Sequence, residues 1–587
     1  MDLIAQDENQ VNTCHLRQSD TLFTPENISD CEKYILTIQR RLDKAVANDD
    51  KFKIKWYTHL LMKRSRAVKI LSVYRVCSVN QGKYTAGVDG VSMPKEKVKR
   101  TEMMIELLNS IDILQKPQPI RRVFIPKPNG TKRPLGIPTI SDRINQDIIR
   151  QTIEPICEYH FKTCSYGFRP KRSCQDAMSD LFNKLGKPNS RRWIIEGDIK
   201  GCFDNINHGH IISTMRKWNI TNPICRIVRK MLKSDIMWGN DTTPSTSGTP
   251  QGGIISPMLA NIALTCLDEE IEKVCGRTGR NMSWIVRYAD DFIIVAVNEQ
   301  DAKEIRKHIK TFLPNHIGVE LSDEKTLITE ISKGFDFLGF NFRKYKNTLK
   351  IKPSKDSIIS IKHKIALKIR ELSTTSMDIL LSNLNPIISG WGHYYRHCVS
   401  SDIFAYIDDY VWNKIWQWTK RKHPTRGGKH RRNRYTQKAT DNNRWIFYDS
   451  NTNKILMKMR SIVIKRFIKV VNDIRVYDAN ASEYWDKRVY MNAKDSIYGN
   501  KTLTELFRRQ KGRCEYCNRP ITTEQIKDGK LHKHHLKPRS QGGDWKSGNL
   551  RLLHSECHTS LHGNITRKDM ARFANNGIDY LKIMRFT

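Results

Sequence analysis

Apolar residues recur at three- and four-residue intervals between residues 31 and 79, as in YILTIQRRLDKAVA. This spacing predicts amphipathic, basic helices. In residues 120–140, two strand-like runs flank a Pro-Asn-Gly turn, which predicts a strand, a turn and a return strand. Helical and strand patterns then alternate for roughly 200 residues, which favours an α/β arrangement. From residue 352 to about 418 the period is helical again. The pattern therefore predicts a multidomain α/β chain with a helical segment in its second half.

The same pattern places two adjacent aspartates inside an apolar hairpin. In RYADDFIIV, Asp290 and Asp291 interrupt strand-forming residues, although neighbouring carboxylates repel and are costly to bury. Asp198 follows a similar apolar run in RWIIEGDIKGCFD. Three carboxylates at the ends of neighbouring strands can hold two divalent cations about 4 Å apart, an arrangement suited to phosphoryl transfer. Adjacent strand residues face opposite ways, so Asp290 is expected to be the stronger ligand. A surface turn is the alternative, because Asp is a common turn residue.

Charge and length narrow the class of protein. The 587 residues include 101 Lys and Arg against 61 Asp and Glu, a net charge of +40 that favours a nucleic-acid partner. A chain of this length requires about three to five domains.

No apolar run reaches the ~20 residues of a membrane helix, so no membrane partner is expected. The scattered cysteines favour a reducing compartment. The first residues, MDLIAQDENQ, resemble neither a signal nor a transit peptide, which favours the bacterial cytoplasm or an organelle-encoded protein.

Metal-type spacing is found near the end of the sequence. Cys-x-x-Cys in GRCEYCNRP and His-x-x-Cys in LLHSECHTSLH predict a tetrahedral zinc site. Its four ligands would be Cys514, Cys517, His554 and Cys557. A zinc ribbon that only binds DNA is the alternative reading of the cysteines alone.

Several motifs in a fixed order give the chain a family resemblance. They are GVDG (87–90), SYGFRPKRSCQDA (165–177), DIKGCFD (198–204), GTPQGGIISPMLANIAL (248–264), YADD (288–291), LSDEKT (321–326) and FDFLGF (335–340). In this order they closely resemble the reverse transcriptases encoded by group II introns. The resemblance extends over roughly residues 35 to 587.

The resemblance implies a right-hand polymerase with additional domains. The expected division is a polar leader (1–34), fingers and palm (35–350), a helical thumb called domain X that supports splicing (351–435), a DNA-binding region (436–497) and a small ββα-metal HNH domain (498–587). Within the thumb, LNPIISGWGHYYRH offers His393, Tyr394, Tyr395 and Arg396 as RNA contacts, although aromatic residues on helices are more often core. KRKHPTRGGKHRRNR (420–434) is expected to be a loop that orders on nucleic acid, with a solvated linker as the alternative.

The resemblance also implies roles for residues around the aspartates. Asp198, Asp290 and Asp291 match the triad that binds Mg²⁺, and Phe203 matches the ring that packs under the incoming sugar and excludes a 2′-hydroxyl. The other expected contacts are Lys127 and Arg133 with the triphosphate, Gln251 and Gly252 near the nascent base pair, Lys325 with template or primer, and Tyr288 beside the primer end. Solvated cations and a core tyrosine are the alternatives for Lys127, Arg133 and Tyr288.

The order of residues between the two zinc-ligand pairs resembles an HNH nuclease. His558 and His562 are four residues apart and share a helix face, so with His534 they can hold one catalytic divalent ion. His535 is the expected general base, because a neutral imidazole accepts a proton near pH 7. Asn549 is expected to hold the loop that orients this base.

Together these motifs predict a group II intron-encoded protein that copies RNA into DNA, assists splicing, binds DNA and nicks the second strand. The implied partners are intron RNA, target double-stranded DNA and dNTPs. The implied cofactors are Mg²⁺ in the polymerase and in the nuclease, and structural Zn²⁺ in the C-terminal domain. The sequence leaves open a homodimer. The alternatives are a splicing-only RNA-binding maturase with inactive centres and a reverse transcriptase recruited to defence or repair.

Overall fold

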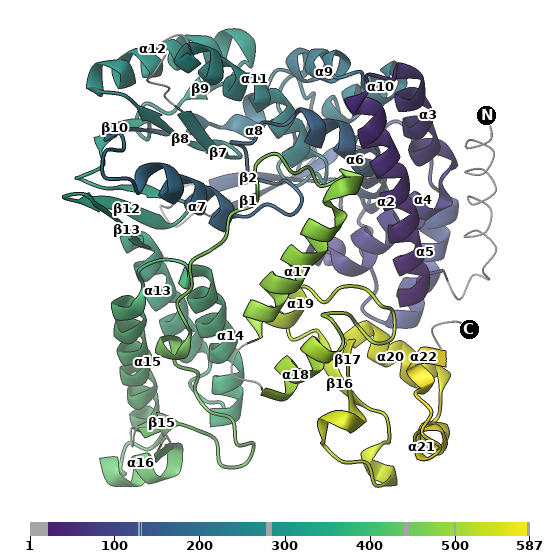
Figure 1. Cartoon of the computed structure of the whole chain (residues 1–587), viewed down its shortest axis with the longest axis vertical. Helices are drawn as coiled ribbons and strands as arrows, with labels where there is room; N and C mark the ends of the chain where they lie inside the picture. Colours follow the sequence, from purple (N-terminus) through teal and green to yellow (C-terminus); the bar gives the residue numbers. More distant parts are fainter. Residues whose placement is uncertain are drawn as a thin grey trace.

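The computed structural model describes residues 22–126, 130, 132–276, 284–438, 445–497 and 501–583. Lys127 lies outside the described residues. In Figure 1 the helices and sheets of the first 350 residues form the upper part of the molecule. A column of helices, in green, lies below them on one side. The C-terminal elements, in yellow, lie on the other side near the N-terminal helices. Among the described residues, no helix has the combination of length and apolarity that a bilayer span requires.

Helices α2 (Pro25–Ala47), α4 (Arg66–Tyr74) and α6 (Ile140–His160) pack together near the N-terminus. Thr24 caps α2 by accepting a hydrogen bond from the backbone N–H of Asn27, and Pro25 suits the first turn. The helix thus begins nine residues before the predicted end of the leader, and Ile28 and Cys31 are fully buried. The expected leader boundary at residue 34 therefore differs from the structure.

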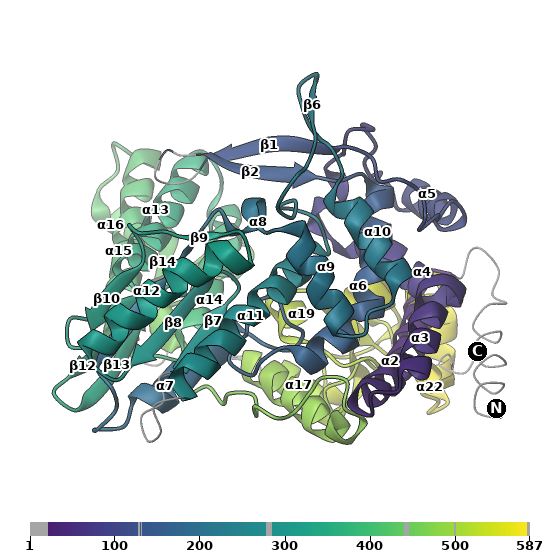
Figure 2. The same cartoon turned by 90° about the horizontal axis from the view of Figure 1, so that it is seen from above.

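The central sheet is antiparallel and has the strand order β10-β3-β8-β7. Its strands are β3 (Trp193–Gly197), β7 (Trp284–Tyr288), β8 (Asp291–Ala296) and β10 (Leu327–Glu330). Helices α11 (Ser256–Gly276) and α12 (Glu299–His316) pack on the sheet, and α7 (Cys174–Leu185) contacts β7 (Figure 2). Consecutive residues Ile194 and Ile195 enter different hydrophobic clusters, so the sheet is buried on both faces.

A second sheet, with the order β2-β1-β5-β6, extends away from the central one (Figure 2). Its strands are β1 (Ile120–Pro126), β2 (Lys132–Ile137), β5 (Ile236–Trp238) and β6 (Asp241–Thr243). β1 and β2 are antiparallel, from Arg121 opposite Ile137 to Pro126 opposite Lys132. This pairing confirms the predicted strand and return strand, and most of the predicted turn lies outside the described residues.

The helical column follows a three-stranded sheet of β11 (Phe335–Phe337), β12 (Phe340–Tyr345) and β13 (Thr348–Pro353). Its long helices are α13 (Lys355–Glu371), α14 (Met377–Tyr395) and α15 (Ser401–Lys422). The helical prediction for this segment is confirmed. The loop prediction for residues 420–434 is wrong for most of its length, because α15 continues to Lys422 and α16 spans Gly428–Tyr435.

The C-terminal part contains a hairpin of β16 (Leu531–His535) and β17 (Leu550–His554) followed by α20 (Ser555–Asn564). Its other helices are α17 (Ser482–Ser496), α18 (Lys501–Arg509), α19 (Thr523–Lys527), α21 (Arg567–Asn575) and α22 (Tyr580–Ile583). The remaining helices and strands are α3 (Lys51–His59), α5 (Lys97–Asn109), α8 (Cys202–Asn205), α9 (His208–Lys217), α10 (Asn222–Leu232), β4 (Ile199–Lys200), β9 (Glu320–Leu321), β14 (Thr436–Lys438) and β15 (Trp445–Phe447). The β16-β17-α20 order agrees with the predicted ββα arrangement.

Polar contacts join this C-terminal part to the N-terminal helices. Tyr74 on α4 donates a hydrogen bond to Glu556 on α20 (2.5 Å), and Glu556 pairs with Arg519 (2.5 Å). Arg519 also lies 3.9 Å from Glu32 on α2 and donates to the sulfur of Cys517 (3.4 Å). Burial raises the pKa of Glu32, and Arg519 opposes that rise. We call these five residues the docking network.

Candidate active sites

The hairpin turn between β7 and β8 presents Asp290 and Asp291. Ala289 has φ +59°, the left-handed conformation, so the chain reverses sharply at the tip. The turn packs closely against Gly167. A methyl group on Gly167 would lie 2.4 Å from the backbone nitrogen of Ala289, so only glycine allows this contact. The turn removes the strict alternation of a strand, which brings both aspartates near Asp198.

A fully buried arginine supports the turn from below. Arg287 pairs with Asp268 on α11, with 2.8 Å between Nε and Oδ1. Its Nη1 donates to the backbone carbonyl of Ala289 (3.0 Å) and to the side chain of Asn261 (2.9 Å). Asn261 donates in turn to the carbonyl of Gly167. Arg287, Asp268 and Asn261 have no predicted role, because they become neighbours only in the folded chain.

The three aspartates affect one another electrostatically. Burial, followed by the negative charges of Asp290 and Asp198, raises the pKa of Asp291 to about 7. Burial also raises the pKa of Asp290, and Asp198 adds to that rise. Carboxylates held together in this way favour any partner that supplies positive charge. The donor set therefore fits Mg²⁺, which prefers carboxylate oxygens.

Lys325 supplies one such positive charge. Its ammonium group lies 2.8 Å from the carboxylate of Asp198, and hydrogen bonding to Asp198 is the main cause that raises the pKa of Lys325. The side chain is largely exposed, at 68%. The expected template or primer contact stays a prediction, and in this structure the ammonium points at the carboxylates.

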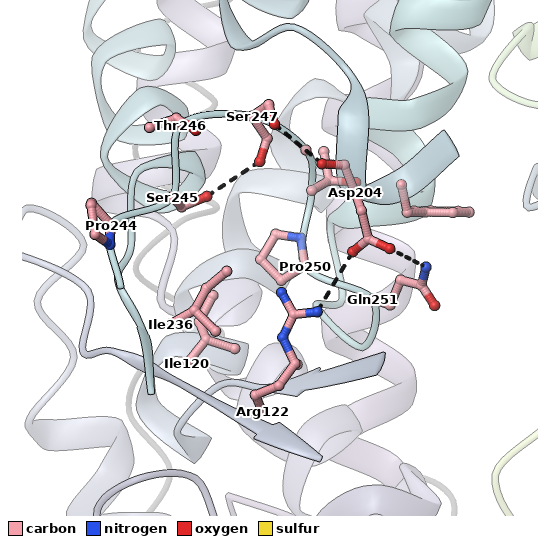
Figure 3. A pocket seen from close by; sticks show the side chains of 14 residues that line it. Ile120, Arg122, Asp204, Ile236, Pro244, Ser245, Thr246, Ser247, Pro250 and Gln251 are labelled. Carbon is pink, nitrogen blue, oxygen red and sulfur yellow. Dashed lines mark hydrogen bonds and ion pairs between the residues drawn. The ribbon is translucent and has the colours of Figure 1, made fainter. Parts of the chain in front are cut away.

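A cavity lies between the second sheet, which contributes Ile120, Arg122 and Ile236, and the segment 244–251, with Asp204 on its wall (Figure 3). Arg122 on β1 and Gln251 both point at Asp204. Nη1 of Arg122 lies 3.9 Å from the Asp204 carboxylate in an ion pair, and Nε2 of Gln251 donates a hydrogen bond to it over 3.1 Å. Phe203 also lines this cavity. The structure thus brings Phe203 and Gln251 together as expected and adds Arg122 and Asp204, which the sequence analysis did not single out.

Close backbone packing shapes one wall of this cavity. Gly252 has φ +119°, and a methyl group there would lie 2.4 Å from the carbonyl oxygen of Gly136. Gly136 donates a backbone hydrogen bond to the carbonyl of Gln251 (2.6 Å). A side chain at Gly252 would therefore collide with the backbone of β2. Burial raises the pKa of both Asp204 and Asp290, and the charge of Arg133, exposed on β2, opposes that rise.

Tyr288 is half-buried and packs against the hydrophobic cluster behind the sheet. Its ring lies 6.4 Å from that of Phe168, which lies 6.4 Å from the ring of Phe203. Phe168 itself is 56% exposed in a left-handed conformation. An aromatic surface therefore connects Tyr288 to the cavity, and the expected primer contact of Tyr288 stays a prediction.

Two of the four thumb residues proposed as RNA contacts are buried. Tyr395 donates to the carbonyl of Gly339 (3.1 Å), and Arg396 donates to the carbonyls of Val463 and Asp495. Each is 4% exposed. The interpretation of Tyr395 and Arg396 as RNA contacts is therefore wrong, because both side chains join the thumb to the segments that follow it.

The predicted zinc ligands come together in the C-terminal part. One ligand atom each from Cys514, Cys517, His554 and Cys557 lies within 4.8 Å of the others, and all four residues are buried. Three sulfurs and an imidazole nitrogen form a donor set that tetrahedral Zn²⁺ accepts, so these residues fit a closed structural site.

A second cluster joins the hairpin to α20. His534, His558 and His562 also have ligand atoms within 4.8 Å of one another. Burial and the neighbouring imidazoles lower the pKa of His534 to about 3 and that of His558 to about 4. Neutral imidazoles present lone pairs at pH 7, so the cluster fits a divalent metal ion.

His535 lines the cavity beside this histidine cluster, together with Arg539 and Arg567. Its Nε2 is buried and has no hydrogen-bond partner in the described part of the chain. Burial is the main cause that lowers its pKa, with Arg539 adding to the effect. A neutral, unpartnered imidazole nitrogen at a cavity wall suits a general base.

Asn549 fixes the loop that follows the hairpin strand. Its side chain donates to the carbonyls of Lys537 (3.1 Å) and Asp544 (2.9 Å) and accepts from the N–H of Lys537 (2.8 Å). All these contacts are with backbone, so Asn549 acts on His535 through the loop and is a positioning residue.

Four family models match this chain. They are the N-terminal domain of reverse transcriptase (residues 27–107), reverse transcriptase (RNA-dependent DNA polymerase) (125–342), the group II intron maturase-specific domain (358–436) and HNH endonuclease (514–564). The fold and its two centres thus define a reverse transcriptase joined to an HNH domain.

Similar proteins narrow this class. Group II intron-encoded protein LtrA of Lactococcus lactis is 33% identical over 375 residues, which cover 53% of this chain and 60% of LtrA. Protein YkfC of Escherichia coli is 31% identical over 343 residues, 52% of this chain and 87% of YkfC. The chain belongs to the family of group II intron-encoded reverse transcriptases with maturase and HNH domains. A telomerase structure from Candida tropicalis aligns with a TM-score of 0.35 and 14% identity, over 53% of this chain and 61% of that one.

Proposed function

We propose that this chain is a multifunctional group II intron-encoded protein: an RNA-directed DNA polymerase, a maturase for its intron RNA and a DNA endonuclease. One observation carries the proposal. The chain holds two chemically distinct centres, a carboxylate turn at the central sheet and a histidine cluster beside a Cys₃His site. Carboxylates suit phosphoryl transfer to a growing strand, whereas imidazoles with a neighbouring base suit hydrolysis.

In the polymerase, Asp198, Asp290 and Asp291 would hold Mg²⁺, which stabilises the charge that develops on the transferred phosphate. Arg133 is placed to contact the triphosphate, and Gln251 to contact the nucleotide beside the cavity. Phe203 would pack under the sugar, where a 2′-hydroxyl would clash with its ring. These roles follow from the family resemblance, and the position of Phe203 and Gln251 on the wall of one cavity supports two of them.

In the nuclease, His535 would remove a proton from water, and His534, His558 and His562 would hold the divalent ion that neutralises charge on the scissile phosphate. Arg539 and Arg567 line the same cavity and would bind the DNA backbone. The Cys₃His site would hold Zn²⁺ and stabilise the small domain.

Intron RNA and double-stranded DNA are the proposed macromolecular partners. Helix α16 exposes Lys429, Arg432 and Arg434, and the whole chain carries a net charge of +40. Such charge supports salt-dependent binding to phosphates. We place the protein in the bacterial cytoplasm, bound to its intron RNA.

Three assays on one purified chain test the proposal. They are primer extension on an RNA template, splicing of the intron RNA that contains the gene for this protein, and nicking of double-stranded DNA. All three activities are expected. A chain that splices without extending primers would be a splicing-only maturase, and one that extends primers without supporting splicing would be a recruited reverse transcriptase.

A further inference from the structure

We propose that the segment from Arg567 to Ile583 completes the nuclease centre, with Tyr580 as the positioning residue that orients the metal ligand His534. The segment follows the region that matches the HNH family model, which ends at residue 564. The inference rests on the proposed nuclease function and concerns how its metal site is built.

The first argument is the direction of hydrogen bonds at Tyr580. The tyrosine Oη lies 2.6 Å from Nε2 of His534 and 3.1 Å from the carbonyl oxygen of Leu536. The carbonyl of His535 also lies 3.5 Å from the hydroxyl, and since carbonyls only accept, we assign the hydroxyl proton of Tyr580 to this carbonyl side. Tyr580 then accepts from His534, whose proton is thereby fixed on Nε2. The Nδ1 lone pair of His534 is left for a metal ion.

The second argument is how firmly Tyr580 is held. Its side chain is 1% exposed, and Leu581 is fully buried in the same hydrophobic cluster as Cys514, Cys557 and Leu561. A phenol in a packed core has little freedom to rotate, so its hydroxyl keeps one position relative to the imidazole. A tightly held partner for the non-ligating nitrogen increases the affinity of a histidine site for its metal.

The third argument comes from the hairpin register. His534 on β16 is paired with Arg551 on β17, and Arg551 Nη2 lies 3.0 Å from Asp579. His534 therefore contacts Tyr580, and its cross-strand neighbour Arg551 contacts the preceding residue, Asp579. The same segment contributes Arg567 to the cavity wall. It is thus anchored at the metal cluster and reaches the proposed DNA path.

The test is Tyr580→Phe, which removes the hydroxyl and keeps the ring in the core. Ni²⁺ binding to the zinc-loaded chain is measured by calorimetry, because Ni²⁺ accepts imidazole ligands. Asp290→Asn is present throughout to suppress binding at the carboxylates. We expect Ni²⁺ affinity to fall about 10- to 100-fold, as for other lost partners of metal-bound histidines. Zinc content and the thermal unfolding midpoint should stay at the parent values.

Nicking provides the second readout. Excess Mg²⁺ should restore nicking in Tyr580→Phe and should fail to do so in His535→Ala, because the first change weakens metal binding and the second removes the base. Tyr490→Phe is the matched control, since it removes a hydroxyl from a tyrosine stacked on Phe507 in the neighbouring core. It should leave Ni²⁺ affinity unchanged.

Each other outcome has a defined meaning. Unchanged Ni²⁺ affinity in Tyr580→Phe overturns the inference, as does a matching loss of zinc or of thermal stability, which would make Tyr580 a packing residue only. Absence of both nicking and histidine-dependent Ni²⁺ binding in the parent, judged against His558→Ala, would instead refute the proposed nuclease function.

Discussion

Arg287 and Asp268 form an ion pair in which both side chains are completely buried, and the arginine of this pair also holds the carbonyl of Ala289 at the catalytic turn. The pair connects helix α11 to the residue that precedes Asp290. Removing one partner of a buried pair leaves an uncompensated charge, which costs about 3–5 kcal/mol.

We therefore expect Asp268→Ala to lower the free energy of unfolding by ~3–5 kcal/mol and to abolish primer extension even below the unfolding temperature, because the turn loses its support. Urea unfolding and primer extension check both effects. Asp147→Ala is the control, because it breaks the partly buried pair with Arg150 on α6, away from the turn. It should destabilise the protein with a much smaller effect on extension. Equal loss of extension in both variants would mean that Arg287 has no special role at the turn.

Asp290→Asn is expected to abolish polymerisation and to leave RNA binding and splicing nearly unchanged, because an amide replaces a charged ligand without altering the protein's outer surface. Primer extension, a filter-binding assay and a splicing assay measure the three properties. Substantial dNTP incorporation by this variant would refute the assignment of the metal-binding aspartates.

The raised pKa of Asp291 predicts a pH-dependent response to Mg²⁺. The carboxyl keeps its proton in the folded chain up to about pH 7 and loses it near its ordinary value in the unfolded chain. Stability of the metal-free protein thus falls as pH rises from about 4 to 7, since the folded state binds more protons there. Mg²⁺ competes with the proton, so it should raise the unfolding temperature more at pH 8 than at pH 6. Asp291→Asn should greatly reduce this difference, and the same Mg²⁺ shift at both pH values would contradict the assignment.

Phe203→Val should admit ribonucleotides into the product, because the ring that lines the cavity no longer fills the space of a 2′-hydroxyl. Extension with mixed dNTPs and rNTPs, followed by alkaline cleavage, measures the effect. If ribonucleotides are excluded as well as in the parent, Phe203 is a packing residue and another side chain selects the sugar.

His535→Ala and Cys514→Ser should separate the two metal roles of the nuclease. The first should stop nicking with zinc retained, because the base is no ligand. The second should release zinc and unfold the small domain, since a module of this size depends on its metal. Elemental analysis and a nicking assay check both variants. Zinc loss in His535→Ala would show that base and ligand are assigned the wrong way round. Primer extension should survive His535→Ala.

The residues that form local sequence motifs could be placed in advance. Asp290 and Asp291 of RYADDFIIV, Asp198 of DIKGCFD, the paired zinc ligands and the histidines four residues apart follow chain-local spacing, which strands and helices preserve. Asp204, Asp268 and Tyr580 could not be found this way, because their partners lie 47, 19 and 46 residues away in the chain. The loop prediction at residues 420–434 was wrong because tertiary packing stabilises helices there despite the dense positive charge. Arg431 stacks over Trp416, which supports the helix there.

The docking network has a consequence for how such proteins can be recombined. Arg519 donates to a sulfur of the zinc site and pairs with Glu556, while Glu32 and Tyr74 belong to helices at the opposite end of the chain. A nuclease transplanted from this chain onto an unrelated polymerase would carry Arg519 and Glu556 without their counterparts on α2 and α4. Exchange of either domain is therefore expected to require compensating changes at these positions in the other.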